Sequence, residues 1–313
     1  MLGRIFFYVT HIIIYMKGFG KLLFCFIMVV AVCSCGEDDD RLPVAQQPNT
    51  EGINVNKNNA SENSAYERLE FPRLKGGNSM VIVHSTADYG INFAVEWDYQ
   101  KKSQRWSCYQ MYAANSGGNV GRYNGDPQYP FDPKLPAEYY FDSDPFWRSG
   151  YDHGHIVPSA DRQSTKEVNM QTFYLTNMQP QKNQFNAGLW AKMEQQVRDW
   201  NVSSFRDVLY VCKGGTIDKE SQILETLPNG LIVPRYFFMA VLCKNAQGYK
   251  AMGFWVEHIN ADHSHDQLAQ YVVNIDELER LTGIDFFCNL VDDEEEKAES
   301  ESRANIIKAW GVR

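Results

Sequence analysis

The chain has 313 residues; 44% are hydrophobic, 22% are charged, and the formal net charge is −9. This composition excludes an intrinsically disordered chain, a collagen-like repeat and a coiled coil, and the length allows one or two domains. The acidic balance argues against a protein that holds nucleic acid by bulk positive charge, but it leaves room for an enzyme with a local basic groove.

The first 35 residues have the pattern of an export signal. The cationic segment 16–21 precedes the apolar run 22–32, and a run of about 11 residues is too short to span a bilayer, which needs ~20. The sequence that follows, Val32-Cys33-Ser34-Cys35, resembles a bacterial lipobox. Residues 1–35 are therefore predicted to be a lipoprotein signal peptide whose natural start is Met16, with Cys35 as the lipidated residue. A plain signal peptide cut nearby is the alternative.

The segment after Cys35 is predicted to be a tether. Residues 37–40 are Glu-Asp-Asp-Asp, which resembles the surface-export signals of some bacterial lipoproteins; a solvated charge run is the alternative. Residues 36–65 contain few large apolar side chains, so they are expected to stay disordered. The folded domain is expected over residues 66–313. The exported protein is expected in the cell envelope, anchored by its lipid in the outer membrane and exposed at the surface.

Strands outnumber helices in residues 66–313. Apolar and alternating runs predict strands over residues 81–83, 91–97, 106–112, 172–175, 208–212, 236–242 and 251–256. In the second strand, Ile91, Phe93, Val95 and Trp97 are expected on one face. Helices are predicted over residues 187–200, 276–281 and 306–310. The Gly-, Pro- and Asp-rich segment 115–150 is expected to be mostly irregular. This order predicts an α+β fold with a central antiparallel sheet flanked by helices.

One group of residues suggests proton transfer beside a metal ion. Histidine is the side chain best suited to move a proton near neutral pH, and His155 follows His153 and Gly154. Gly154 is expected to allow a tight backbone turn that aims His155 away from the sheet. Downstream, Asn186 offers a neutral amide oxygen, a hard ligand that suits Mg²⁺. In a regular helix Glu194 would lie roughly 12 Å farther along the axis than Asn186, and it could still reach the water shell of the ion.

The joint spacing resembles the sugar-non-specific DNA/RNA endonuclease family, the Serratia-type nucleases with a ββα-metal (His-Me) finger. The family pattern is Asp-Arg-Gly-His, then Asn-x-x-Pro-Gln, then a second Asn, then Trp and Glu. The matching positions here are His155, Asn177, Asn186, Trp190 and Glu194. The segments 210–215, 232–237 and 281–287 also resemble later parts of the family sequence.

The resemblance implies a role for each matching residue. His155 would be the general base that takes a proton from water. Asn186 would be the direct protein ligand of Mg²⁺, with Mn²⁺ as the alternative ion. Asn177 would orient His155 or the waters of the ion, and Glu194 would hydrogen-bond those waters. Arg122, which lies 33 residues before His155, would contact the phosphate.

Position 153 departs from the family pattern, because His153 stands where the family has Arg. A guanidinium is always charged and grips phosphate with two bonds, whereas an imidazole near neutral pH is partly uncharged and makes one. His153 is still expected to bind substrate, and Arg162 is a further candidate for a basic groove together with Lys182, Lys192, Arg198 and Arg235.

The resemblance implies a Mg²⁺-dependent endonuclease that hydrolyses DNA and RNA without regard to sugar or sequence and leaves 5′-phosphate ends. Two alternatives stay open: a phosphodiesterase that acts on a small or lipid substrate, and a catalytically weakened lipoprotein that only binds nucleic acid. The oligomeric state is left open.

Three other patterns have weaker interpretations. His258, His263 and His265 could hold zinc, but their segment is expected to be a surface loop. The acidic stretch 292–301 could bind calcium or be a solvated face, and it lacks the spacing of an EF-hand. Four cysteines of the mature chain allow three disulfide pairings, between which the sequence does not choose: Cys108, Cys212, Cys243 and Cys288.

Overall fold

The computed structural model describes residues 52–313. The expected signal peptide 1–35, with its lipidation site Cys35, and residues 36–51 of the expected tether lie outside the described residues. Among residues 52–313, no helix is both long enough and apolar enough to cross a bilayer.

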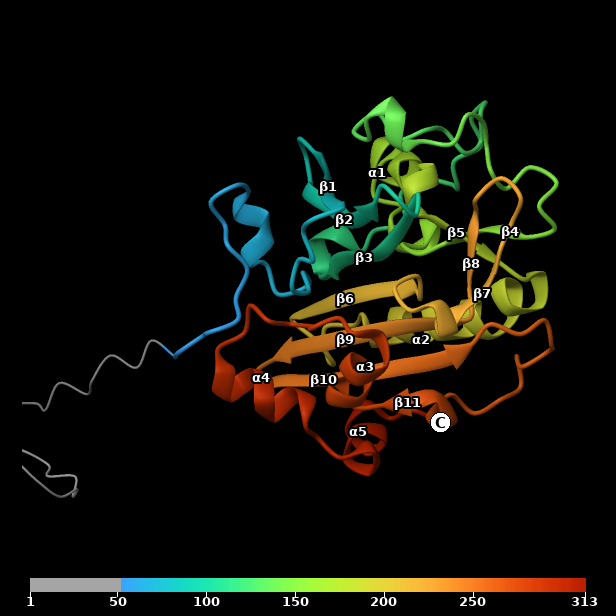
Figure 1. Ribbon diagram of the computed structural model, residues 1–313. Coiled ribbons are helices and arrows are strands. Elements are labelled where there is room, and N and C mark those ends of the chain that lie inside the picture. Colours follow the sequence, from blue (N-terminus) through green and yellow to red (C-terminus); the bar gives the residue numbers. More distant parts are fainter. Residues whose placement is uncertain (1–51) are drawn as a thin grey trace, which may run out of the picture. The chain divides into compact units, whose positions relative to one another are not determined.

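A seven-stranded antiparallel sheet organises the domain (Figure 1). Its strand order is β1-β2-β3-β6-β9-β10-β11. The strands are β1 (Ser79–Thr86), β2 (Gly90–Asp98), β3 (Ser103–Met111), β6 (Val208–Gly215), β9 (Tyr236–Asn245), β10 (Gly248–Glu257) and β11 (Val272–Val273). Two smaller antiparallel pairs stand apart from it: β4 (Asp152–His155) with β5 (Met178–Gln181), and β7 (Ile223–Thr226) with β8 (Ile232–Pro234). The predicted α+β class with a central antiparallel sheet is confirmed.

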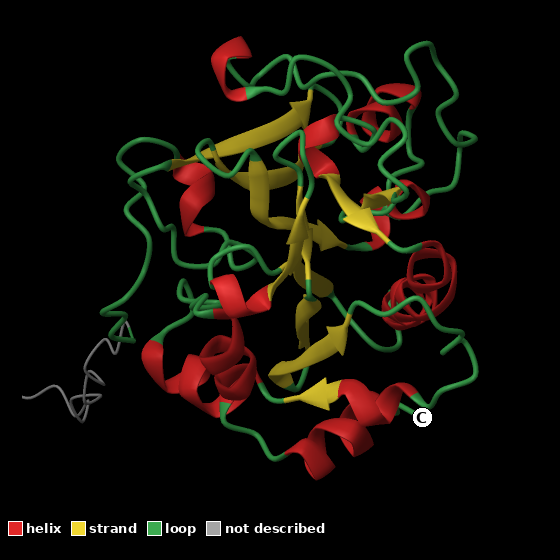
Figure 2. Ribbon diagram, turned by 45° about the vertical axis from the view of Figure 1, so that its right-hand side comes forward, coloured by secondary structure: helices red, strands yellow, loops and turns green. Residues whose placement is uncertain are grey.

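Helices cover both faces of the sheet (Figure 2). The α-helices are α1 (Lys166–Gln171), α2 (Ala191–Trp200), α3 (Ile275–Thr282), α4 (Asp292–Glu299) and α5 (Arg303–Trp310), and a π-helix, η6 (Phe185–Trp190), leads directly into α2. The apolar residues of α2 and α5 join one core, and those of α3 and α4 join the other. Gly283 ends α3 in a left-handed conformation with φ +75°, which glycine adopts without steric cost.

Period-two alternation assigns the strand side chains to the two cores. In β9, Phe237, Met239 and Val241 face the core that contains α2. Phe238 and Ala240, the residues between them, face the core that contains α3. Because every second side chain of a strand points to the same face, a sheet buried on both faces shows a continuous apolar run rather than an alternating one.

Two expectations about strands are wrong. Residues 172–175 form turns and the start of a short 3-10 helix instead of a strand. In β2, Phe93 and Val95 face the core with α2, but Ile91 packs on the other core and Trp97 joins a third cluster. Register irregularities at both ends of β2 interrupt the alternation.

The expected tether 36–65 is wrong for its last part, because residues 52–65 pack on the domain. Asn58 is buried, and its side-chain amide donates to the carbonyl of Pro72 at 2.9 Å. The side chain of Asn54 donates to the carbonyl of Cys288 at 3.0 Å. The polar composition that suggested disorder instead supplies hydrogen bonds to backbone groups, so the domain begins before residue 66.

The four described cysteines are free and buried. Cys108 and Cys212 are directly opposite each other in the register of β3 and β6. Burial raises the pKa of both thiols well above its usual value, so neither is a reactive thiolate in this state.

Candidate active site

The strands β4 and β5, followed by η6 and α2, form the predicted ββα finger. The two strands pair antiparallel, with His155 opposite Met178 and Asp152 opposite Gln181. The η6 helix places Asn186 beside Asp152, the first residue of β4. The side-chain nitrogen of Asn186 donates to Asp152 Oδ2 at 3.1 Å. The finger therefore brings together residues that are more than 30 positions apart in sequence.

Gly154 is needed in the finger because β4 and β5 lie close together at this position, and not because the backbone turns there. It lies inside β4 and has no positive φ. A Cβ atom at this position would lie 2.7 Å from the carbonyl oxygen of Gln179 on the paired strand. The expectation of a tight turn is wrong, and the need for glycine comes from the contact between β4 and β5.

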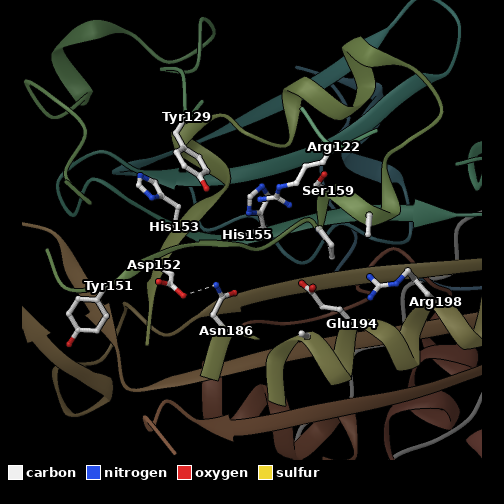
Figure 3. Close-up of a pocket in the computed structure, with 13 residues that line it drawn as sticks. Arg122, Tyr129, Tyr151, Asp152, His153, His155, Ser159, Asn186, Glu194 and Arg198 are labelled. Carbon is white, nitrogen blue, oxygen red and sulfur yellow. Dashed lines mark hydrogen bonds between the residues drawn. The ribbon is translucent and has the colours of Figure 1, made fainter. Parts of the chain in front are cut away.

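A single cavity, here called the active-site cavity, contains most of the predicted site (Figure 3). Its volume is about 430 Å³. Its lining includes Arg122, Tyr129, Tyr151, Asp152, His153, His155, Ser159, Asn186, Glu194 and Arg198. Catalytic and metal-binding residues expected from the sequence thus meet in one place, together with two arginines.

His155 has the protonation state that a general base requires. Its Nε2 is buried and has no hydrogen-bond partner among the described residues. In the neutral tautomer that is protonated on Nδ1, Nε2 carries a free lone pair. Burial, followed by the positive charge of Arg122, lowers the pKa of His155 to about 3, so the imidazole is neutral at pH 7. The edge of Phe173 fixes the ring, with centroids 4.8 Å apart.

Asn186 is held by its nitrogen, so its oxygen is available. The nitrogen points to Asp152, and the oxygen is turned to the opposite side, toward Glu194 (Figure 3). The expected position of Asn186 at the start of a regular helix is wrong, because the residue lies within the π-helix η6. A π-helical turn presents side chains at angles that a regular helix does not, and such turns are frequent at functional sites.

Glu194 lines the cavity from the first turn of α2 and forms an ion pair with Lys213. Its Oε1 lies 3.1 Å from Lys213 Nζ, and Lys213 is fully buried in β6. Burial raises the pKa of Glu194 and lowers that of Lys213, and the ion pair opposes both shifts. Lys213 therefore fixes the carboxylate at the wall of the cavity.

The two arginines of the cavity are held differently. The guanidinium of Arg122 stacks over Phe173 at 4.7 Å from the ring centroid, and within residues 52–313 it forms no ion pair with a carboxylate. Arg198 Nη1 lies 3.0 Å from Asp161 Oδ1. Arg122 is thus the guanidinium that is free to meet an anion.

The structure places His153 in a tight slot. Its ring stacks on Tyr129 with centroids 3.8 Å apart and on Phe146 at 4.5 Å. Its Nε2 lies 2.9 Å from Asp144 Oδ2. His153 lines the cavity, but the nitrogen expected to meet phosphate is already paired with a carboxylate.

Two other expected site residues lie outside the cavity lining. Asn177 is fully buried; its side chain accepts from the amide of Val157 and donates to the carbonyls of Val157 and Thr172. It therefore fixes the backbone that follows His155, and none of these hydrogen bonds goes to the imidazole. Arg162 is also buried and donates to the carbonyl of Gln110 at 2.7 Å. Its expected role in binding substrate is wrong, because the guanidinium is used inside the fold.

Several residues of the site were missed from the sequence. Asp152, the partner of Asn186, directly precedes His153 in the sequence, and the single lysine in the buried strand 208–215 is a signal for Lys213. Tyr129 and Asp144 come from the irregular segment 115–150, which has no periodicity that could place them. The suspected zinc ligand His258 is buried, accepts from the amide of Lys182 and contacts the carbonyl of Pro234.

The donor set of the cavity fits a hard divalent cation. Asn186, Glu194 and Asp152 present amide and carboxylate oxygens, the ligands that such ions prefer. The buried lone pair of His155 Nε2 is the one orphaned ring nitrogen in the cavity lining. The residues present therefore suit an oxygen-bound metal beside a neutral base.

Comparison with known proteins agrees with this geometry. The family model described as DNA/RNA non-specific endonuclease matches residues 81–293. The chain is 28% identical over 214 residues to a protein named mitochondrial nuclease EXOG from Xenopus laevis, covering 64% of this chain and 58% of that protein. It is 31% identical over 208 residues to a nuclease from Nostoc sp., covering 63% of this chain and 72% of that protein.

A solved structure shares the fold. The crystal structure of the EndoG/EndoGI complex matches with a TM-score of 0.57 at 19% identity, covering 69% of this chain and 89% of that chain. The chain spans about three fifths of the length of the Xenopus relative. The matched segment 81–293 contains both strands of the finger, η6 and α2. The chain therefore belongs to the DNA/RNA non-specific endonuclease family.

Proposed function

We propose that this protein is a Mg²⁺-dependent endonuclease that hydrolyses phosphodiester bonds of DNA and RNA without sugar or sequence specificity. The observation that carries the proposal is the buried, unpartnered Nε2 of His155 in a cavity that also presents Asn186 and Arg122. A base, an oxygen donor for a metal and a free guanidinium are the groups that hydrolysis of an anionic diester requires.

Each residue has one task in this proposal. His155 Nε2 takes the proton from the attacking water, because this nitrogen is unpartnered and the ring is packed against Phe173. Arg122 contacts a non-bridging phosphate oxygen. Asn186 Oδ1 would hold the ion, and Glu194 would accept hydrogen bonds from its waters.

The reaction determines the product ends. When bound, Mg²⁺ neutralises charge on the phosphate and stabilises the leaving 3′-oxygen, with Mn²⁺ as a substitute. Cleavage of the bond between phosphorus and the 3′-oxygen leaves the phosphate on the 5′-oxygen of the next nucleotide. Contacts with phosphate carry no sequence information, and a site that ignores the 2′-hydroxyl accepts DNA and RNA alike.

Incubation with plasmid DNA and ribosomal RNA tests the proposal. Both polymers should be cut with Mg²⁺ and spared with EDTA. His155→Ala should lower the rate by ~10²–10⁴, whereas the matched variant of the exposed His265, His265→Ala, should cut normally. Hydrolysis of small diesters alone would favour the phosphodiesterase alternative, and binding without hydrolysis would favour the weakened binder. Retained cleavage by His155→Ala refutes the assignment of the base.

The proposed location follows from the leader sequence. The lipobox-like run that ends at Cys35 supports export and a lipid anchor in the outer membrane, with the enzyme exposed at the cell surface. Mass spectrometry of the N-terminus of the mature protein tests this. Lipid on Cys35 is the expected result, and an unmodified terminus starting at residue 36 or later would exclude the anchor.

A further inference from the structure

A second cavity on the domain has no role in the proposed nuclease reaction. It has a volume of about 440 Å³ and is here called the acidic cavity. Every residue that lines it is Asp or Glu, except Asn56. The carboxylates come from α3, α4 and the loop between these helices, and Asn56 comes from the N-terminal segment. Four parts of the fold therefore converge on one acidic hollow.

The carboxylates are close enough to share one ligand. Asp276, Glu279 and Glu299 each offer an oxygen, and these oxygens lie within 4.8 Å of one another. None of the lining residues carries a positive charge. The carboxylates therefore repel one another, and a positive ion placed among them would remove the repulsion.

Two buried oxygens in this cavity have no hydrogen-bond partner. Glu299 is only 7% exposed, and its Oε1 is unpartnered among the described residues. Asn56 Oδ1 is also buried and unpartnered, although the amide nitrogen of the same side chain donates to Asp285 Oδ2 at 3.3 Å and to Glu295 Oε1 at 3.2 Å. An unsatisfied buried oxygen carries a free-energy cost. Two such oxygens line this cavity, so a ligand that gives them a partner would remove the cost.

We infer that the acidic cavity is a structural Ca²⁺ site, with carboxylates of Asp276, Glu279 and Glu299 and the amide oxygen of Asn56 as its ligand group. Ca²⁺ takes six to eight oxygen ligands in flexible geometry, and it accepts carboxylates and amide carbonyls together. Mg²⁺ demands a near-ideal octahedron and keeps several waters, so a crowded set of carboxylates suits it less well.

The site would fasten the N-terminal segment to the end of the domain. Residues 54–58 already bond to the segment 285–292, for example through the amide of Val55, which donates to Asp292 Oδ1 at 3.1 Å. Ca²⁺ shared by Asn56 and the helices α3 and α4 would connect segments that are more than 200 residues apart in sequence.

A calcium titration of the full chain, freed of divalent ions with EDTA, tests this inference. Ca²⁺ should raise the melting temperature by several degrees and bind with one site per chain in calorimetry. Glu299→Gln keeps the shape of the side chain and removes its charge. It should weaken Ca²⁺ binding at least tenfold while raising the melting temperature of the metal-free protein, an outcome that a misfolded variant would not give.

Two control variants separate this site from other sources of binding. Glu138→Gln removes an exposed carboxylate outside the cavity, and it should bind Ca²⁺ normally. Asn186→Ala alters only the proposed metal ligand of the active-site cavity, so it should keep the full stabilisation by Ca²⁺. Either of two results overturns the inference: a melting temperature that does not respond to Ca²⁺, or an equal loss of affinity in Glu299→Gln and Glu138→Gln.

Discussion

The active-site cavity and the acidic cavity have nearly equal volumes, about 430 and 440 Å³, but the first contains charges of both signs and the second contains negative charges alone. The active-site cavity mixes Arg122 and Arg198 with Asp152 and Glu194. The acidic cavity contains carboxylates and a single amide. A site that must admit a phosphate has to leave part of the negative charge to the substrate, whereas a site that only holds a cation can supply all of it.

The largest effect on the active-site cavity is expected from substitution of Asn186, the proposed metal ligand. Asn186→Ala should lower the rate of plasmid cleavage about 100-fold or more, because even outer contacts of a metal site are worth ~10–100-fold in affinity or activity. Asn186→Asp makes the active-site cavity resemble the acidic cavity. It should bind the ion more tightly and the polymer more weakly, seen as a lower Mg²⁺ requirement with a higher KM. Unchanged kinetics in both variants would exclude Asn186 as the ligand.

The second prediction concerns Asp152, which orients Asn186 through a hydrogen bond of 3.1 Å. Asp152→Ala leaves the amide free to rotate, so the rate should fall by roughly 10-fold at low Mg²⁺. Excess Mg²⁺ should recover most of the loss, since the amide oxygen itself remains. Asp142→Ala, at an exposed position outside the cavity lining, is the control. A loss that no concentration of Mg²⁺ reverses would show that Asp152 acts in another way.

The sequence predicted the central features of the fold because they have strong local signals. The apolar runs of β6, β9 and β10 and the Asn/Gly-bounded helix α3 were all expected. Residues 172–175 misled because an apolar run buried by loops looks the same in sequence as a buried strand. The acidic stretch 292–301 was considered as a calcium site, but the cavity could not be predicted, because Asn56 and α3 join that stretch only through tertiary packing.

The residues of the candidate site were likewise predicted only in part. His155, Asn186, Glu194 and Arg122 line one cavity, as their spacing and the family resemblance implied. Arg162 was expected to bind substrate and Asn177 to orient His155 or the waters of the ion, but both side chains form hydrogen bonds with backbone groups inside the fold. Residue type and spacing show which groups are available, whereas only packing shows which of them remain free to bind a ligand.

The third prediction tests the support of the finger. His258 contacts the carbonyl of Pro234 and accepts from the amide of Lys182 at 2.7 Å, four residues before Asn186. His258→Ala should lower the free energy of unfolding at pH 7.5 by about 1–3 kcal/mol, since it leaves buried backbone groups unpaired. Denaturant unfolding measures this, with His265→Ala as the control. An unchanged free energy would contradict the proposed support.

The contribution of His258 to the free energy of unfolding should depend on pH. Burial lowers the pKa of His258 to about 4, below its usual 6.5. Between these values the unfolded chain binds more protons than the folded one, so the contribution of His258 is complete above pH 6.5 and is lost as the pH falls through 4. The stability difference between the wild type and His258→Ala should therefore shrink over this window, and a constant difference would count against a neutral buried imidazole.

The smallest expected effect is that of His153→Arg. A guanidinium is planar, so it can stack in the slot between Tyr129 and Phe146, pair with Asp144 and still offer N–H groups to a phosphate. The variant should keep or raise the rate of plasmid cleavage. A large loss would show that the imidazole has a task which the guanidinium of other family members does not perform.

The position at which the described chain starts has a consequence for access. The described chain begins near α4, because the amide of Val55 donates to Asp292 at the start of that helix, whereas β4 and β5 lie on the opposite side of the domain (Figure 1). With the proposed attachment at Cys35, the tether would join the domain on the side away from the finger. Long polymers could then reach the active-site cavity without passing the point of attachment.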